Sequence, residues 1–354
     1  MFAATLSDKT MRQLHLWLGV MVFFMVAIVL LGGITRLTDS GLSITEWKPV
    51  TGILPPLSEQ AWLDEFIKYQ GIPEYQAVNS GMTLDEFQRI FWWEWAHRFL
   101  GRLVGLAFFV PFLWFLVTRQ LTRNMTARLA AIFLLGAFQG ALGWYMVQSG
   151  LTERIDVSQY RLAAHLATAV LIYGAILWTM FGLHRERSGQ GGVPFKWELR
   201  AAILVLLIYA QVVLGAFVAG LHAGLTFNTW PLMDGGLVPN GMFAMSPWYL
   251  NIFENVATVQ FNHRLLAYVV FVLSLYHVAR VLGRKLEDER MMHGQGSAVV
   301  LLLLIFAQSA LGIFTLLFQV PISLALLHQA GALAVFAAAL HHFFIVTREP
   351  ATGA

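Results

Sequence analysis

Four histidines could carry the chemistry of this sequence, because each lies near one end of a long apolar segment. They are His97, His165, His263 and His328. Ionisable side chains inside apolar segments are costly and are usually functional. Two neutral imidazoles that face each other across a helix bundle can bind a haem iron from both sides. We therefore predict the pairs His97 with His165 and His263 with His328, although the sequence leaves open a pairing between the first two histidines and the last two.

Zinc is the competing metal for these histidines. It would need a third or fourth protein ligand nearby and a compact polar site. The chain contains no cysteine, which excludes thiolate metal sites, iron–sulfur clusters and covalent attachment of a c-type haem. The apolar surroundings favour two large haem cavities over a zinc site.

Five arginines accompany the histidines: Arg36, Arg98, Arg102, Arg161 and Arg264. A planar guanidinium group is suited to pairing with the propionates of a haem. The same placement also suits long basic side chains that extend to the membrane interface. Both interpretations stay open.

Glu94 marks a difference between two similar segments. It precedes His97 by three residues, whereas Gln260 holds that place before His263. Residues at this spacing share a helix face, so we expect Glu94 to face the same cavity as His97. A carboxylate there could accept or pass a proton or stabilise a cationic intermediate. The alternative is an acid that stabilises the helix N-terminus or pairs with Arg98. The difference predicts a reactive N-terminal site and an inert, electron-carrying C-terminal site.

The composition shows which elements must position these residues. Of the 354 residues, 58% are hydrophobic and only 12% are charged, which needs lipid as the solvent and excludes a soluble enzyme or a nucleic-acid-binding domain. A span of about 20 residues crosses about 30 Å of hydrocarbon. We predict eight spans, at residues 14–34, 92–117, 128–148, 161–183, 199–221, 260–282, 298–318 and 324–346.

The basic residues predict the orientation of the chain. Eight spans place both termini on one side, and most of the 23 Lys and Arg residues lie in segments on that side. By the positive-inside rule both termini are cytoplasmic. We therefore expect a multi-pass protein of the bacterial inner membrane, with the four histidines towards the periplasmic side.

The two halves of the chain resemble each other. The run Gly41–Trp47 matches Gly224–Trp230, and the histidine-bearing spans correspond in order. Two units of four helices with the same orientation are related by a pseudo-twofold axis along the membrane normal. The predicted fold is an all-α integral membrane protein of two four-helix bundles. Its N-terminal half is 1–190, with a long outer loop 35–91, and its C-terminal half is 191–354.

The spans without these histidines share a Leu-Gly pattern. It runs from Ile28 to Gly32, and three times from glutamine to glycine: Gln139 to Gly143, Gln211 to Gly215 and Gln308 to Gly312. Small residues allow helices to approach closely, and glutamine can form a hydrogen bond across the interface. We interpret the pattern as helix packing rather than as chemistry.

Local signals predict helices inside the long outer loop. Ser58 could cap a helix that carries Trp62, Phe66 and Tyr69 at helical spacing. The run from Thr83 has the pattern of a capping box and should begin a helix that continues into the second span.

The order of the motifs resembles that of the haem A synthase family over almost the whole chain. The resemblance depends on the first-loop sequence from Gly32 to Trp47 and on four short motifs: Glu94-Trp-Ala-His97-Arg98, Ala164-His165, Asn262-His263-Arg264 and Leu327-His328. The absence of first-loop cysteines is similar to the alphaproteobacterial and mitochondrial branch of that family.

This resemblance implies a haem-dependent oxidoreductase. Its reaction oxidises the C8 methyl group of haem O to a formyl group through a hydroxymethyl stage, which makes haem A for a terminal oxidase. It also implies that His263 and His328 ligate a haem b cofactor, that His97 and His165 contact the substrate haem O, and that Glu94 is catalytic.

The same resemblance implies haem O synthase as a partner within the lipid bilayer. An electron donor or acceptor is needed but not identified by the sequence, a homo-oligomer stays open, and no nucleic acid is expected. The oxygen source, water or dioxygen, also stays open.

Two other functions compete. A bis-histidine di-haem b cytochrome would transfer electrons and form no product, which the difference between Glu94 and Gln260 argues against. A transporter or haem-delivery protein would place polar groups near the bilayer midplane and use broken helices, whereas here the polar residues lie near one face.

Overall fold

Eight long helices dominate the computed structural model, which describes residues 6–49, 51–152, 154–183, 195–287 and 289–347. All eight are long and apolar enough to cross a membrane, and no β-strand forms in these ranges, so the predicted all-helical membrane fold is confirmed. The eight are α1 (Asp8–Leu37), α4 (Leu84–Val117), α5 (Arg123–Thr152), α6 (Gln159–Leu183), α7 (Phe195–Gly220), α9 (Val256–Leu282), α10 (Glu289–Leu317) and α11 (Ile322–Val346).

Short helices occupy the two long connections. The first connection holds η1 (Thr51–Ile53), α2 (Glu59–Gln70) and α3 (Pro73–Ala77). The second holds η2 (Ala223–Leu225), η3 (Trp248–Leu250) and α8 (Asn251–Glu254).

The chain divides into two compact units, Met1–Ile172 and Tyr173–Ala354. Helix α6 crosses this boundary, so each unit takes part of it. The division that the sequence predicts, after residue 190, falls at 184–194, outside the described residues. The pseudo-twofold relation between the halves stays a prediction.

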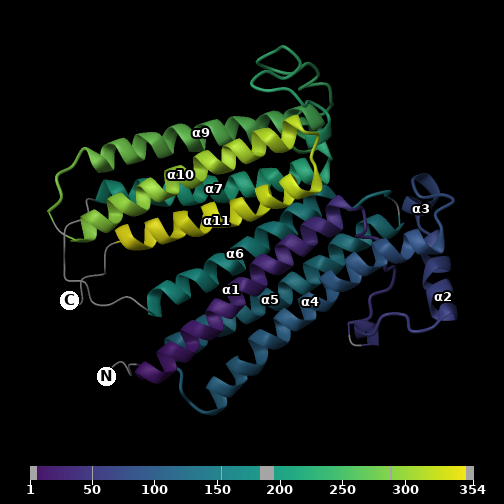
Figure 1. Ribbon diagram of the computed structural model, residues 1–354, viewed down its shortest axis with the longest axis horizontal. Helices are drawn as coiled ribbons and strands as arrows, with labels where there is room; N and C mark the ends of the chain where they lie inside the picture. Colours follow the sequence, from purple (N-terminus) through teal and green to yellow (C-terminus); the bar gives the residue numbers. More distant parts are fainter. Residues whose placement is uncertain (1–5, 50, 153, 184–194, 288, 348–354) are drawn as a thin grey trace. The chain divides into compact units, whose positions relative to one another are not determined.

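In the first unit, α1 packs along α4 (Figure 1). The Trp17 ring lies against Phe108 and Phe115, with centroids 5.0 and 5.8 Å apart. Its indole Nε1 donates to the backbone carbonyl of Ala107 at 2.9 Å. The buried indole therefore keeps its hydrogen bond within the apolar contact between the two helices.

The outer-loop helix α2 is fastened to the first turns of α4. Its predicted N-cap is confirmed, because the Ser58 hydroxyl accepts from the backbone N–H of Ala61. The predicted capping box at Thr83 is also confirmed and begins α4, eight residues before the expected span at 92. Phe66 of α2 lies 5.0 Å from the ring of Phe87 on α4. Local capping and aromatic burial thus extend α4 beyond the apolar span.

In the second unit, α7, α9, α10 and α11 lie alongside one another (Figure 1). Trp197, Val281, Met291 and Val346 form part of a buried cluster near the ends of these helices. This packing fixes α9 and α11, which carry two of the predicted histidines.

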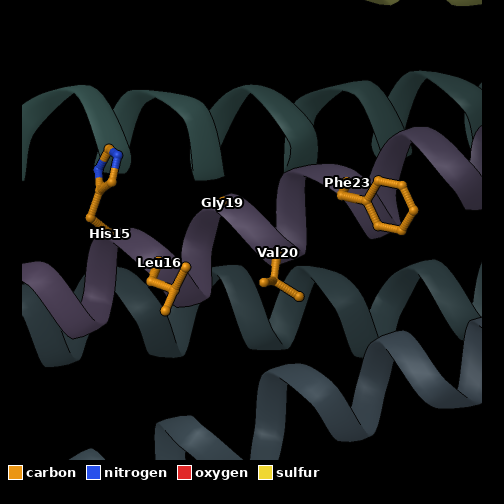
Figure 2. Close-up of a pocket in the computed structure, with 5 residues that line it drawn as sticks. All are labelled: His15, Leu16, Gly19, Val20 and Phe23. Atoms are coloured by element: carbon orange, nitrogen blue, oxygen red, sulfur yellow. The ribbon is translucent and has the colours of Figure 1, made fainter.

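A shallow groove with a volume of about 400 Å³ runs along the first half of α1. His15, Leu16, Gly19, Val20 and Phe23 line it (Figure 2). None of the four predicted histidines is among these residues, so the groove is separate from the site described next.

Candidate functional site

Each of the four predicted histidines packs against a glycine of a neighbouring helix. A Cβ atom built on that glycine would lie between 2.8 and 3.3 Å from the Cε1 atom of the imidazole, closer than ordinary contact. The ring therefore occupies space that only glycine leaves free. The four pairs are Gly32 of α1 with His97 of α4, Gly143 of α5 with His165 of α6, Gly215 of α7 with His263 of α9, and Gly312 of α10 with His328 of α11.

Three of these histidines are also held by a glutamine one turn before the glycine. The amide Nε2 donates to the backbone carbonyl of the histidine at 2.8 to 3.0 Å and lies 3.1 Å from its Nδ1 atom. The pairs are Gln139 with His165, Gln211 with His263, and Gln308 with His328. The sequence analysis anticipated a glutamine hydrogen bond across the helix interface, but not that its partner is the histidine.

An electrostatic interaction links the rings of His97 and His165, and another links those of His263 and His328. His97 and His165 belong to the first unit, and His263 and His328 belong to the second. Within the described residues, no group of three or more His, Asp or Glu side chains is placed to hold a metal ion, so no third zinc ligand joins either pair.

These side chains fit the axial ligation of haem. The glutamine contacts reach the Nδ1 side of His165 and His328, and among the described residues no hydrogen bond reaches Nε2 of either ring. A histidine that ligates a metal through Nε2 donates an Nδ1–H group, so the amide oxygen of the glutamine, rather than its nitrogen, would face the ring when haem is bound. In His263 the Gln211 amide lies near both ring nitrogens, at 3.1 and 3.3 Å.

Glu94 is buried and its carboxylate is fully occupied by the first outer loop and by Arg98. Oε2 accepts from the hydroxyl of Ser43 and from the backbone N–H of Ile44, both at 2.7 Å. Oε1 accepts from Nε and Nη2 of Arg98 at 3.0 and 2.6 Å. Among the described residues Glu94 forms no hydrogen bond with His97, so the expectation that both face one cavity stays a prediction.

Arg98 ties the same loop to α4. Its Nη2 and Nη1 atoms donate to the backbone carbonyls of Ile44 and Glu46 at 2.7 and 3.0 Å. Glu94 and Arg98 together therefore hold Ser43, Ile44 and Glu46 of the loop motif by charge-assisted bonds.

The second unit repeats this arrangement with neutral partners. Arg264 donates to the backbone carbonyls of Phe227 and Thr229 at 2.7 and 2.9 Å, which are the matching positions of the second loop motif. Gln260 accepts from Arg264 at 3.2 Å and donates to the carbonyl of Ala223 at 2.8 Å. The sequence repeat thus extends to individual hydrogen bonds, and the carboxylate of Glu94 is its main chemical difference.

The other predicted arginines also bind protein groups. Arg36 forms ion pairs with Asp39 and Asp156 at 3.0 and 2.9 Å. Arg102 donates to the carbonyls of Pro49 and Lys48.

Arg161 donates to the carbonyl of Tyr145 at 2.7 Å, and its guanidinium lies 3.7 Å from the centre of that ring. The buried guanidinium atoms without a hydrogen-bond partner among the described residues include Nη1 of Arg102 and Nε of Arg264.

A second buried carboxyl group lies in the outer loop. Burial raises the pKa of Glu74 in α3 to about 8, with smaller contributions from the negative charges of Asp156, Asp39 and Glu94, while Arg36 opposes the rise. No pattern in the sequence marked Glu74, because its burial depends on how α3 packs.

Comparisons with known proteins agree over almost the whole chain. Residues 15–340 match the family model COX15-CtaA, cytochrome oxidase assembly protein. The Heme A synthase of Parvibaculum lavamentivorans is 50% identical over 339 residues, which cover 95% of each chain. That of Rhizobium meliloti is 49% identical over 337 residues, covering 95% of this chain and 90% of the relative. That of Chelativorans sp. is 51% identical over 341 residues, covering 96% and 93%.

Proposed function

Because the chain belongs to the COX15-CtaA family of cytochrome oxidase assembly proteins, we infer that it performs the reaction of its Heme A synthase relatives. The protein is a membrane oxidoreductase that converts haem O to haem A. In this reaction the C8 methyl group becomes a formyl group through a hydroxymethyl stage.

The observation that carries the assignment of sites is the pair of partly buried histidines in each unit. In the second unit His263 and His328 would hold a resident haem b, which supplies a redox-active iron when bound. In the first unit His97 and His165 would hold the substrate haem O. The support is that each ring fits against a glycine and that three have a glutamine at Nδ1, which leaves these side chains suited to ligating iron.

Glu94 would serve as the group that takes up a proton as the methyl group is oxidised. Its carboxylate lies three residues before His97, and the matching residue of the second unit, Gln260, cannot titrate. A proton taken up at Oε2 could pass to the hydroxyl of Ser43, which already lies 2.7 Å away. Arg98 would keep the carboxylate oriented and compensate its charge through two bonds to Oε1.

The arginines would bind the propionates of the two haems. Arg102 and Arg264 support this role best, because each retains one buried guanidinium nitrogen without a partner among the described residues. Arg36, Arg98 and Arg161 would contribute positive charge while they hold the loops and helix ends.

We place the protein in the bacterial inner membrane with both haem sites towards the periplasmic side. The excess of Lys and Arg in the segments on the side of the termini supports this orientation. Haem O synthase would supply the substrate, and an electron carrier would complete the reaction.

The test is to extract and separate the haems of a host that makes haem O, with and without this protein. Haem A or its hydroxymethyl precursor should appear only with the protein. The Glu94→Gln variant should accumulate haem O while it still binds haem. Haem B alone in the purified protein, with haem O unchanged in the cells, would instead identify an electron-transfer cytochrome.

A further inference from the structure

The four histidines are not held alike. A glutamine amide contacts both the ring and the backbone carbonyl of His165, His263 and His328. The same helical position opposite His97 is occupied by Ile28, which offers no polar side chain. Nδ1 of His97 is buried and receives no side-chain hydrogen bond among the described residues; the hydrogen-bonding contact of this ring is with the backbone of Ile28.

The glutamine amide can serve either tautomer of its histidine. As placed here, Nε2 can donate to an unprotonated Nδ1. The amide oxygen Oε1 of Gln139, Gln211 and Gln308 is buried and has no hydrogen-bond partner. Rotation of the amide would offer an acceptor to an Nδ1–H group, which is the form of the ring that binds metal through Nε2, in exchange for the amide's bond to the histidine backbone carbonyl.

We propose that Gln139, Gln211 and Gln308 are positioning residues that hold three of the four axial histidines, and that Ile28 leaves His97 as the replaceable ligand of the first-unit pair. The inference rests on the proposed function, because it takes the histidines as haem ligands. A hydrogen bond at the ring nitrogen that does not bind the metal fixes the ring of a ligating histidine and strengthens its bond to the metal. A ring held only through a backbone contact, as His97 is by Ile28, is released more easily than a ring that a side-chain amide also holds.

This difference matches what each site must do. A resident haem stays bound through many turnovers, so both of its ligands should be held, as His263 and His328 are. A substrate haem must bind and then leave as product, so one ligand bond has to break each time. His97 is the ligand whose bond would break first, while the Gln139 amide keeps His165 in place.

The first experiment adds the missing amide. The full-length protein in nanodiscs is loaded with ferric haem, and the haem that it loses to an excess of an apo-globin scavenger is followed by absorbance. We expect a fast phase from the first-unit site and a slow phase from the second. Ile28→Gln should slow the fast phase about 10-fold or more. Ile28→Met, which has similar length and no hydrogen-bonding group, should not slow it.

The second experiment removes an amide from the second unit. Gln308→Met should accelerate the slow phase about 10- to 100-fold and should shift or broaden the low-spin ferric EPR signal, because the ring of His328 is no longer oriented. The matched control is Gln295→Met on the same helix. The Gln295 amide also donates to two backbone carbonyls, those of Val281 and Arg284, but contacts no histidine. Its slow phase and EPR signal should equal those of the wild type.

The outcomes separate the two proposals. If the wild type binds no low-spin haem, or if His97→Ala and His263→Ala keep both haems, the proposed ligands are wrong. If those histidines are required, but Ile28→Gln and Gln308→Met release haem at wild-type rates with unchanged EPR signals, only the positioning role is wrong. Should Gln308→Met fail to fold, the Ile28→Gln comparison still decides, because it adds a group and removes no hydrogen bond.

Discussion

Replacing Gly312 of α10 by alanine would place a methyl carbon 2.8 Å from Cε1 of His328. Ordinary van der Waals contact begins at 3.4 Å, so the ring or the helix must move by about 0.6 Å. A ligand in a functional site tolerates a displacement of about 0.5 Å. We therefore expect Gly312→Ala to impair haem binding in the second unit more than it impairs the fold.

The effect on stability can be bounded. Extra carbon in a packed core costs about 1–3 kcal/mol, whereas alanine is favoured over glycine inside a helix by about 0.5–1 kcal/mol. The net loss for Gly312→Ala should be roughly 0.5–2 kcal/mol, too small to unfold the protein. Gly296 on the same helix provides the control, because a Cβ there would meet nothing within 4 Å. Gly296→Ala should be as stable as the wild type or slightly more stable.

The assay combines thermal unfolding by tryptophan fluorescence with haem content per protein from pyridine haemochrome absorbance. Gly312→Ala should lose most of the second-unit haem, and Gly296→Ala should lose none. The same comparison applies in the first unit to Gly32→Ala, with a 2.9 Å contact, and Gly19→Ala, which meets nothing within 4 Å. Equal haem content and equal melting temperatures in Gly312→Ala and Gly296→Ala would refute the argument that glycine is needed to admit the imidazole.

Two further predictions concern the buried carboxyl groups of the first unit. In Glu94→Gln one carboxylate oxygen becomes an NH2 group, so either the backbone N–H of Ile44 or the guanidinium of Arg98 loses its acceptor. The unsatisfied donor should lower stability by about 1–3 kcal/mol; a melting temperature equal to that of Asp85→Asn, an exposed change on the same helix, would disprove this. For Glu74, the raised pKa means that the stability contributed by its neutral form is fully present below pH 4.5 and lost as pH rises through about 8. Glu74→Gln should therefore melt at about the same temperature as the wild type at pH 5 and at a higher temperature at pH 9. At pH 9 its free energy of unfolding should exceed that of the wild type by up to about 4 kcal/mol, at about 1.4 kcal/mol per pH unit. A constant difference across this pH range would count against the prediction.

The elements of the fold could be predicted because their signals are local. Eight apolar runs gave the spans, and the caps at Ser58 and Thr83 gave the starts of α2 and α4. Each signal acts over one or two helical turns, so the neighbouring residues are enough to recognise it. The apolar span was expected to begin at 92, and the capping box at Thr83 correctly predicted that the helix itself begins earlier.

The histidines of the candidate site could also be found, since a histidine on each of four spans is costly in lipid and stands out in the sequence. Their supporting contacts could not. Gln139 and His165 are 26 residues apart, and Gln211 and His263 are 52 apart. The spacing of glutamine and glycine was visible, but only the packed helices show that it faces a histidine.

The sequence by itself determined the membrane fold, the repeat, the four histidines and the difference between Glu94 and Gln260. The tertiary structure decided what these side chains touch. It showed that Glu94 binds Ser43 and Ile44 of the outer loop, partners that helical spacing could not name. Helical periodicity gives the face of a side chain, whereas its partner depends on which distant segment packs there.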